Sequence, residues 1–303
     1  MLIRTKITGI GDPFILKAGN VYYAYATSAP EKGFRYFTSC NLIDWQDGGF
    51  CYQNSSWGEE CFWAPEVYER GGRYYMLYTA RWKKNHSLRI GLAVADFPEG
   101  PFYDVKEGPI FDFGYACIDA TLFTDDDGKN YLYYVRDCAE NIIDGVHTSE
   151  IYCVELTDDL RKAKGTPRRI VTPDDAWETS LNPAWRWNEG PALLKHGGKY
   201  YLNYSVNCFD SPEYSIGCAV ADAPEGPFVK YGYPVLKKAE GDFSGPGHNS
   251  FFRDADGNLY TAFHIHTDKN KPSGDRRMCI GKAGFSSDGV FFIDVKEGAE
   301  KNK

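Results

Sequence analysis

Several features that mark membrane, zinc-binding or disulfide-rich proteins are missing from this sequence. No stretch of apolar residues approaches the length of about 20 residues that a membrane span needs. The nine cysteines are odd in number and never occur as Cys-x-x-Cys, which argues against a zinc site and against a disulfide framework. The start of the chain has no apolar core of the kind that a signal peptide needs. We therefore expect a cytoplasmic protein with reduced thiols.

The charge pattern argues against a nucleic-acid partner. The net charge is -8, from 34 Lys and Arg against 42 Asp and Glu. The basic residues of the Arg168-Arg169 pair and of residues 268–277 are too few to form a patch that follows a phosphate backbone. We expect neither a nucleic-acid partner nor a membrane partner, and the sequence gives no indication of the oligomeric state.

Aromatic residues and glycine, by contrast, are abundant. Aromatic residues make up 16% of the chain, with 22 Tyr and 19 Phe, and there are 31 Gly. Tyrosine and phenylalanine favour β-strands, and glycine favours the turns between them. The composition therefore predicts an all-β protein.

Five stretches of the chain share one pattern: a polar opening, a short apolar strand, a turn and an aromatic strand. The turns are Gly-Asn, Gly-Gly or Asp-Gly pairs, which are typical of β-hairpins. The stretches recur at intervals of roughly 50 to 70 residues, and they are residues 9–28, 63–81, 118–137, 188–207 and 247–266. This repetition predicts a five-bladed β-propeller that fills residues 1–303 as a single domain. A β-sandwich or two small β-domains are alternatives, but neither accounts for five matched openings.

The opening of each stretch carries ionisable or polar side chains, which should lie close together. In a propeller the inner strands of the blades begin around one end of the central channel. The residues concerned are Asp12, Glu66, Asp119, Glu189 and the pair His248-Asn249. Crowded carboxyl groups push their pKa values apart, which separates an acid from a base. Two such groups facing each other across a pocket are what glycoside hydrolysis requires.

Aromatic side chains near the same openings are candidates for the pocket wall. They are Phe14, Trp63, Trp82, Trp185 and Trp187. Flat aromatic faces suit the apolar face of a sugar ring, although a single tryptophan is more often a core residue. We take Phe14, Trp63 and Trp82 as candidate substrate-binding residues.

These residues match a known family. The segments "WAPEV", "IDATLF", "NEGP" and "GPGHNSFF" lie on successive repeats, and with them the chain resembles glycoside hydrolase family 43 over nearly its whole length. The resemblance implies a catalytic five-bladed propeller that hydrolyses O-glycosyl bonds with inversion. It implies that Asp12 is the general base, that Asp119 orients the acid and raises its pKa, and that Glu189 is the general acid. For Glu66 it implies only a part in shaping the pocket.

The resemblance also implies roles for residues near the end of the chain. His248 matches a histidine on the channel axis that in many relatives ligates a calcium or sodium ion through a mostly water shell, or hydrogen-bonds near the acid. A structural ion on the axis is one expectation, although a single histidine is a poor site for a hard cation. No cofactor is required for the chemistry. Arg276 matches an arginine that contacts sugar hydroxyls, with Arg277 adjacent in register. Of His264 and His266, we expect His264 to face the pocket.

The family acts on α-L-arabinofuranosides, β-D-xylosides and internal links of arabinan, so the resemblance leaves the sugar open. The chain shows neither a secretion signal nor the C-terminal β-sandwich that many β-xylosidases of the family carry. We therefore expect an exo-acting α-L-arabinofuranosidase that takes short arabino- or arabinoxylo-oligosaccharides derived from hemicellulose, with β-D-xylosidase as the alternative. A non-catalytic sugar-binding propeller would be expected to have lost one of the three carboxylates. A mannoside phosphorylase would need a cluster of basic residues around the pocket.

Overall fold

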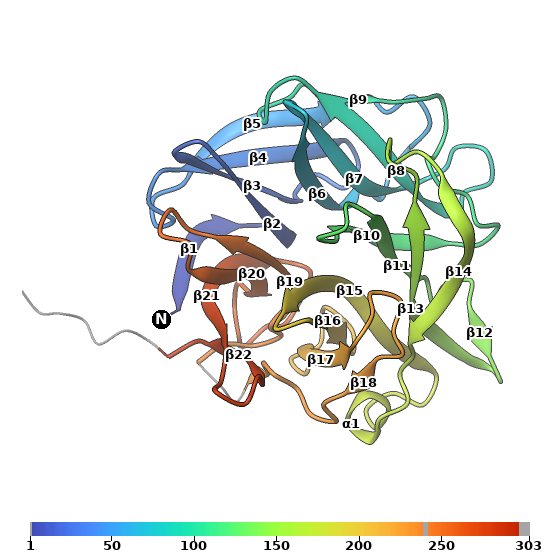
Figure 1. Ribbon diagram of the computed structural model, residues 1–303, viewed down its shortest axis with the longest axis vertical. Helices are drawn as coiled ribbons and strands as arrows, with labels where there is room; N and C mark the ends of the chain where they lie inside the picture. Colours follow the sequence, from blue (N-terminus) through green and yellow to red (C-terminus); the bar gives the residue numbers. More distant parts are fainter. Residues whose placement is uncertain (1, 239–241, 297–303) are drawn as a thin grey trace, which may run out of the picture.

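The computed structural model describes residues 2–238 and 242–296, and it consists mainly of β-strands. The strands form four hydrogen-bonded sheets, which surround a common centre when the molecule is viewed down its shortest axis (Figure 1). One short helix, α1 (Ala176–Thr179), lies at the edge of this view. No helix in the described part of the chain is long and apolar enough to cross a membrane. The predicted all-β fold class is confirmed.

The first two sheets are four-stranded antiparallel meanders, the unit from which propeller blades are made. Their strand orders are β2-β3-β4-β5 and β6-β7-β8-β9. The first contains β2 (Gly11–Ala18), β3 (Val21–Thr27), β4 (Gly33–Ser39) and β5 (Gln46–Gln53). The second contains β6 (Trp63–Arg70), β7 (Arg73–Arg81), β8 (Leu88–Ala95) and β9 (Tyr103–Asp104).

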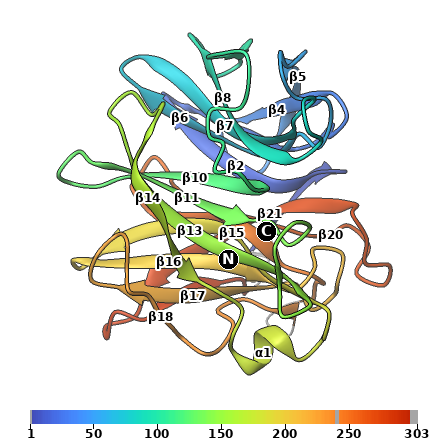
Figure 2. The same ribbon diagram turned by 90° about the vertical axis from the view of Figure 1, so that its right-hand side faces the viewer.

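The third sheet has nine strands because two such groups are joined by a parallel pair. β13 and β15 pair from His147↔Trp185 to Ser149↔Trp187, and Figure 2 shows β13, β15, β16 and β17 running side by side. The nine strands are β10 (Cys117–Thr124), β11 (Asn130–Arg136), β12 (Ile142–Ile143), β13 (Val146–Leu156), β14 (Ala163–Val171), β15 (Trp185–His196), β16 (Lys199–Val206), β17 (Ser215–Ala221) and β18 (Val229–Lys230). Five repeats in the sequence thus give four hydrogen-bonded sheets.

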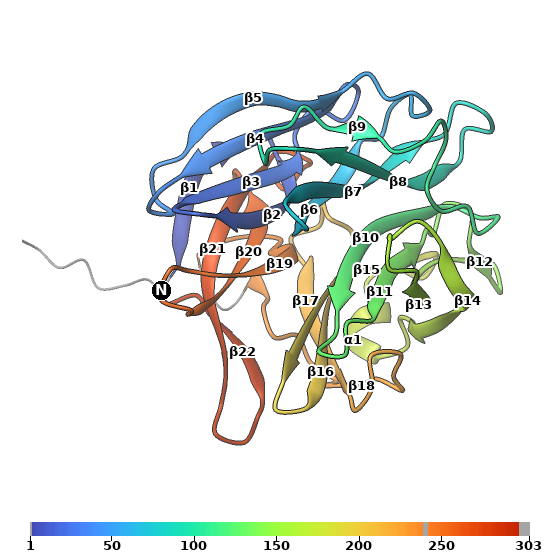
Figure 3. The ribbon, with the colours of Figure 1, turned by 45° about the horizontal axis from the view of Figure 1, so that its top comes forward.

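The last sheet brings together the two ends of the chain. The N-terminal strand β1 (Ile3–Thr8) pairs antiparallel with β21 (Arg276–Phe285), as Figure 3 shows. The sheet is completed by β19 (Gly247–Arg253), β20 (Leu259–His266) and β22 (Phe291–Asp294). Thr5 Oγ1 donates a hydrogen bond to Met278 O at 2.9 Å and accepts one from the Ile7 N–H at 3.2 Å. These bonds help to hold β1 against a strand from the far end of the sequence.

The hairpins lie where the turn signals predicted them. β2 and β3 pair as far as Ala18↔Val21, which leaves the two-residue turn Gly19-Asn20. Gly19 has φ of +58°, a conformation that the tight hairpin turn needs and glycine adopts without strain. The same arrangement recurs at Gly71-Gly72 between β6 and β7, where both glycines have positive φ.

The first strand of each hairpin contains an irregularity near its start that the repeat did not predict. The pairing register shifts in β2, β6, β10, β15 and β19, and at each shift one residue has φ between 45° and 56°. These residues are Asp12, Ala64, Asp119, Gly190 and His248. A β-bulge of this kind takes one residue out of the ladder and re-aims its side chain. Positive φ is unfavourable for all of these residues except glycine, so the surrounding structure must stabilise it.

Buried aromatic side chains fill the space between neighbouring sheets. Phe34, Tyr52 and Tyr78 are each no more than 2% exposed and pack together between the first two sheets. The Tyr52 and Tyr78 hydroxyls lie 2.6 Å apart, and Tyr52 also donates to Asp104 Oδ1 at 2.8 Å. A buried tyrosine needs a partner for its hydroxyl group. Networks of this kind allow a core to contain so many tyrosines.

We expect Thr5→Val to destabilise the protein by about 1 to 3 kcal/mol, because the Ile7 N–H and Met278 O both lose a partner while the side-chain shape is kept. Chemical denaturation measures this free energy of unfolding. The matched control is Thr38→Val on β4, since the Thr38 hydroxyl makes no hydrogen bond with the part of the chain that the structure describes. A loss no larger than in the control would contradict a stabilising role for these bonds.

Candidate active site

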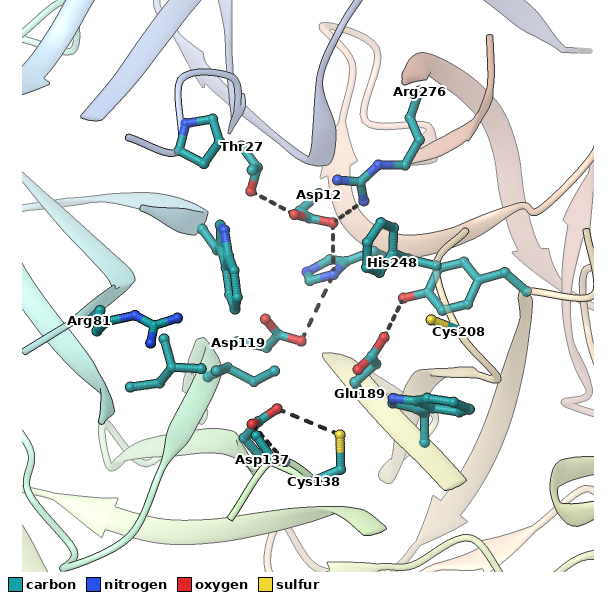
Figure 4. A pocket seen from close by; sticks show the side chains of 18 residues that line it. Asp12, Thr27, Arg81, Asp119, Asp137, Cys138, Glu189, Cys208, His248 and Arg276 are labelled. Carbon is teal, nitrogen blue, oxygen red and sulfur yellow. Dashed lines mark hydrogen bonds and ion pairs between the residues drawn. The ribbon is translucent and has the colours of Figure 1, made fainter. Parts of the chain in front are cut away.

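A cavity of about 480 Å³ lies where the first strands of the hairpins begin (Figure 4). The three residues predicted to be catalytic, Asp12, Asp119 and Glu189, all line it. They come from β2, β10 and β15, so the fold brings together segments that are far apart in the sequence. The other polar and aromatic lining residues include Thr27, Trp63, Arg81, Asp137, Trp187, Phe209, Tyr214, His248 and Arg276.

The bulges decide which side chains reach this cavity. Asp12 and Asp119 occupy the positive-φ position of the bulges in β2 and β10. Glu189 precedes the corresponding position in β15 by one residue, and Glu66 follows it in β6 by two. The four acidic residues therefore hold three different positions relative to the bulge. The sequence analysis grouped these four residues as the openings of matched repeats, and it did not foresee that the bulge gives them different positions.

Glu66 is buried but does not line the cavity. Both of its carboxyl oxygens lie 2.6 Å from Thr121 Oγ1, and the Tyr68 hydroxyl also donates to it. Burial raises the pKa of Glu66 to about 7 despite these hydrogen bonds. Since Thr121 belongs to β10, Glu66 connects two neighbouring first strands and supports the wall from outside the cavity.

The backbone amides at the bulges are held by side chains from the preceding hairpin. An N–H that leaves the ladder inside a protein must find another acceptor. At four of the five bulges the acceptor is a side chain on the second strand of the preceding hairpin. In each case it belongs to the residue that pairs with the last ladder position before that hairpin's own bulge. The bonds are Ala64 N–H to Thr27 Oγ1 (2.8 Å), Asp119 N–H to Thr79 Oγ1 (3.1 Å), His248 N–H to Ser205 Oγ (2.7 Å) and Asp12 N–H to His264 Nδ1 (3.1 Å). The last of these bonds connects the final hairpin to the first.

The amide of Gly190 is the exception. The corresponding residue of the preceding hairpin is Val135, which pairs with Ile118 and has no side-chain acceptor. The Gly190 N–H donates instead to Asp119 Oδ2 at 3.0 Å. An apolar residue at position 135 thus leaves this amide available to fix the Asp119 carboxylate beside the backbone of Glu189.

Asp12 is surrounded by hydrogen-bond donors and positive charge. Its Oδ1 lies 3.0 Å from Arg276 Nη1 and 3.2 Å from His248 Nδ1, and its Oδ2 accepts from Thr27 Oγ1 at 2.6 Å. Burial alone would raise the pKa of Asp12, but Arg276 and these other groups reverse the effect and hold the pKa well below its usual range. A Cβ at Gly11 would lie 2.1 Å from the guanidinium carbon, so glycine there allows Arg276 to approach.

Glu189 has the opposite electrostatic environment. Burial, followed by the charges of Asp119 and Asp137, raises the pKa of Glu189 well above its usual value. The Tyr214 hydroxyl donates to Oε1 at 3.2 Å without reversing this effect. Burial also raises the pKa of Asp119, to about 6. The surroundings thus favour the ionised form of Asp12 and the protonated form of Glu189, the pair that acid–base catalysis needs.

His264 lies behind Asp12 and not in the cavity wall. It is 0% exposed, its Nδ1 accepts the Asp12 N–H, and its ring stacks on Tyr214 with the centroids 5.4 Å apart. Burial lowers the pKa of His264 far below its usual value, so the ring is neutral and carries its proton on Nε2. The predicted pocket position of His264 is therefore corrected: the histidine positions the backbone of Asp12. His266 is equally buried and lies 2.9 Å from Ser244 Oγ.

The other predicted binding residues divide into two groups. Trp63 and Arg276 line the cavity, together with His248, whereas Phe14 and Trp82 do not. Phe14 packs on Tyr68 with ring centroids 5.3 Å apart, and both Phe14 and Trp82 pack against the buried core between the first two sheets. The structure thus places these two partly buried rings against the core and outside the wall of this cavity.

The residues around His248 do not form a complete cation site. His248 Nδ1 lies 3.2 Å from Asp12 Oδ1 and 4.0 Å from Asp119 Oδ2, so the ring is directed at carboxylates. In residues 2–238 and 242–296, no group of three or more His, Cys, Asp or Glu side chains could hold a metal ion. Hard cations prefer several oxygen ligands, which this donor set does not supply. A calcium or sodium ion held mainly by water stays a prediction.

The sequence analysis missed Arg81, Asp137 and Tyr214, which all line the cavity. Arg81 and Asp137 hold equivalent positions in their hairpins. Arg81 lies two residues after Thr79, and Asp137 lies two residues after Val135, and both of these residues pair with the position just before the bulge. Each is also the last residue of its repeated stretch, so a comparison extended to the strand ends would have found them. Tyr214 lies in a loop after β16, outside the repeat, and no local pattern marks it.

We expect Val135→Thr to impair the acid while keeping the fold. A hydroxyl at this position would accept the Gly190 N–H, as threonine and serine do at the other bulges, and Asp119 would lose a bond that favours its ionised form. With less negative charge beside it, Glu189 would have a lower pKa. The alkaline limb of the pH–rate profile should move to lower pH, and kcat/KM should fall by about tenfold, as the loss of one hydrogen bond implies.

The matched control is Val171→Thr, because Val171 is similarly buried in the same core cluster and pairs with Ile151 of β13, away from the bulges of the first strands. Both variants place a hydroxyl in the core, so thermal unfolding should show similar losses of stability. Identical pH–rate profiles in the two variants would contradict the role given to Val135.

Comparison with known proteins supports this description of the site. The model of glycosyl hydrolases family 43 matches residues 7–291. The solved structure of a thermostable family-43 glycoside hydrolase is 45% identical, with a TM-score of 0.92 over 97% of this chain and 95% of that chain. The β-D-galactofuranosidase xynD of Aspergillus niger is 28% identical over 89% of this chain and 76% of its own. An extracellular exo-α-(1→5)-L-arabinofuranosidase of Streptomyces avermitilis is 26% identical over 95% of this chain and 62% of its own.

The similar proteins share a reaction type and differ in the sugar. They include arabinofuranosidases, xylosidases, a galactofuranosidase and arabinanases. The match to one family model covers most of the chain, and the solved relative has the same fold over almost all of it. The chain therefore belongs to the glycosyl hydrolases of family 43, and it is an enzyme that hydrolyses glycosidic bonds.

Proposed function

We propose that this glycoside hydrolase releases terminal α-L-arabinofuranosyl units from short arabino- or arabinoxylo-oligosaccharides, with inversion of configuration. The observation that carries the reaction is the pair of carboxyl groups in one cavity, Asp12 held ionised and Glu189 held protonated. We also propose that the five hairpins begin five blades of one propeller domain. The nine-stranded sheet then contains two blades, joined by the pairing of β13 with β15.

In this mechanism Asp12 is the base and Glu189 is the acid. Asp12 takes a proton from a water molecule, whose oxygen attacks the anomeric carbon on the face opposite the leaving group. Glu189 gives its proton to the glycosidic oxygen, so that the bond to the anomeric carbon breaks and the leaving group departs as a neutral alcohol. Proton exchange with solvent then restores both groups. Asp119, held by the Gly190 N–H, places negative charge near Glu189 and keeps the proton on the acid.

The choice of a furanoside rests on the stereochemistry of the sugars named for two relatives. One is named for an α-L-arabinofuranoside and the other for a β-D-galactofuranoside. The two sugars have the same ring configuration and differ by one hydroxymethyl group outside the ring. A β-D-xyloside has a six-membered ring instead, and it is the alternative substrate. Exo action is proposed because the arabinofuranosidase relative is named as exo-acting.

Two other functions, non-catalytic sugar binding and phosphorolysis of mannosides, have less support. A sugar-binding protein without catalysis does not need a base and an acid in opposite protonation states. A mannoside phosphorylase would need positive groups free to bind phosphate. The two arginines of the cavity wall are already paired, Arg276 with Asp12 at 3.0 Å and Arg81 with Glu60 at 2.9 Å.

The substrate is tested with a pair of 4-nitrophenyl glycosides. We expect kcat/KM for the α-L-arabinofuranoside to exceed that for the β-D-xyloside by about tenfold or more, since a misfitting ring loses contacts in the transition state. The β-D-galactofuranoside should be hydrolysed more slowly than the arabinofuranoside, because the wall must accommodate an extra hydroxymethyl group. Added phosphate should leave the rates unchanged. A preference for the xyloside would replace the proposed sugar and leave the mechanism intact.

The two catalytic assignments are tested by substrates with good and poor leaving groups. Glu189→Ala removes the proton donor, so it should slow substrates with poor leaving groups most and spare an activated aryl glycoside. Asp12→Ala removes the base, so it should abolish hydrolysis of both kinds of substrate. Azide should partly restore the Asp12→Ala enzyme because it attacks without a base. Equal losses on both substrates in Glu189→Ala would count against its assignment as the acid.

A further inference from the structure

Asp137 is a cavity residue whose only part in the mechanism is the charge that it places near Glu189. It directly follows β11, and its side chain lines the cavity with Asp119 and Glu189 (Figure 4). Only 7% of Asp137 is exposed. A buried carboxyl group is costly unless hydrogen bonds compensate for lost water. The partners of Asp137 therefore indicate what the residue can do.

The described structure gives a strong partner to only one of its two carboxyl oxygens. Oδ1 accepts the Ala139 N–H at 3.0 Å, from the loop that follows. The one hydrogen bond to Oδ2 within residues 2–238 and 242–296 comes from the Cys138 thiol, with 3.9 Å between Sγ and Oδ2. A thiol is a weak donor. A strong acceptor with room for a better donor thus remains in the cavity wall.

The neighbouring polar groups of the wall are already engaged with the catalytic carboxyl groups. Arg276, His248 and Thr27 contact Asp12. The Tyr214 hydroxyl donates to Glu189. A bound sugar carries several hydroxyl groups, each of which needs an acceptor when it leaves water. Oδ2 of Asp137 is an acceptor that the chemistry does not occupy.

We propose that Asp137 Oδ2 accepts a hydrogen bond from one hydroxyl group of the sugar unit whose bond is cleaved, and so helps to select the sugar. In Figure 4, Asp12 lies above Asp119 and Glu189, and Asp137 lies below them. Because all four residues line one cavity, a sugar that fills it between Asp12 and Glu189 also has the Asp137 carboxylate in its wall. The inference rests on the proposed roles of Asp12 and Glu189, and it holds for a furanoside or a pyranoside.

The test combines variants of Asp137 with substrates that lack one hydroxyl group. Asp137→Asn keeps the side-chain shape and an acceptor for the Ala139 N–H, and Asp137→Ala removes the group. On the aryl glycoside that the wild type hydrolyses best, kcat/KM should fall about 10- to 100-fold in Asp137→Ala, the factor that a hydrogen bond to a charged group is worth. One member of a series of monodeoxy glycosides should lose a similar factor with the wild type. That member should lose little more when Asp137 is also changed.

Glu140→Gln is the matched control, because it removes the same charge from the same loop at an exposed residue that does not line the cavity, and glutamine keeps an acceptor for the Ala116 N–H. Its kcat/KM should stay within about twofold of the wild type, as is usual for surface substitutions. Thermal unfolding shows which variants are folded. If Asp137→Ala is unfolded, Asp137→Asn carries the comparison across the deoxy series.

Two outcomes would overturn the proposal. The first is an equal loss on every deoxy substrate with a shifted alkaline limb, which would show that Asp137 acts only through its charge on Glu189. The second is an unchanged kcat/KM in the folded variants. The deoxy substrates are derivatives of whichever glycoside the enzyme hydrolyses best. A preference for the xyloside would therefore contradict the proposed arabinofuranoside substrate but not the proposed role of Asp137. Failure of the acid and base assignments would show in the leaving-group experiment.

Discussion

The site depends on five backbone amides that leave their β-ladders. A bulge turns a side chain toward the cavity only by taking a residue out of the ladder, and the freed N–H must then find an acceptor. Side chains on the second strand of the preceding hairpin supply the acceptor at four bulges. At the bulge of β15 the acceptor is Asp119, on the first strand of the preceding hairpin. The same bonds therefore stabilise unfavourable backbone conformations and connect neighbouring hairpins. Because the bond between His264 and the Asp12 amide joins the last hairpin to the first, Asp12, the proposed general base, is held where the two ends of the fold meet.

Burial alone does not set the protonation states in the cavity, because Asp12, Asp119 and Glu189 are all withdrawn from water. What differs is the charge beside each group. Asp12 has a guanidinium at 3.0 Å, which only a glycine at position 11 allows to approach so closely. Glu189 has a neutral tyrosine hydroxyl and two carboxyl neighbours. The neutral state of His264 belongs to the same arrangement, because an imidazolium has no free lone pair with which to accept the Asp12 amide.

Sequence patterns predicted the features that depend on neighbouring residues. The Gly-Asn and Gly-Gly turns mark their hairpins, and the family resemblance placed Asp12, Asp119 and Glu189 in one cavity. The errors arise at the bulges, since one extra residue in a strand moves every later side chain to the opposite face. Glu66 was grouped with Asp12, Asp119 and Glu189, although it lies two residues after the bulge position and they lie at that position or one residue before it. His264 was misplaced because strand alternation gives the face of a side chain and not its hydrogen-bond partner. The parallel pairing of β13 with β15 depends on packing between distant segments, so no local pattern could predict it.

The two strands of each hairpin contribute to the site under different constraints. First strands carry the proposed acid and base at or beside bulges whose amides must be satisfied, so the positions of these two groups are fixed by the fold. Arg81 and Asp137 come at the ends of second strands, two residues beyond the bulge partners, where the chain enters loops. Side chains at strand ends can change with little effect on the ladder, because loops tolerate variation that strands do not. If Asp137 contacts the sugar as proposed, recognition at these strand ends can vary while the proposed acid and base stay in place, which gives a physical reason why relatives of one fold are named for several different sugars.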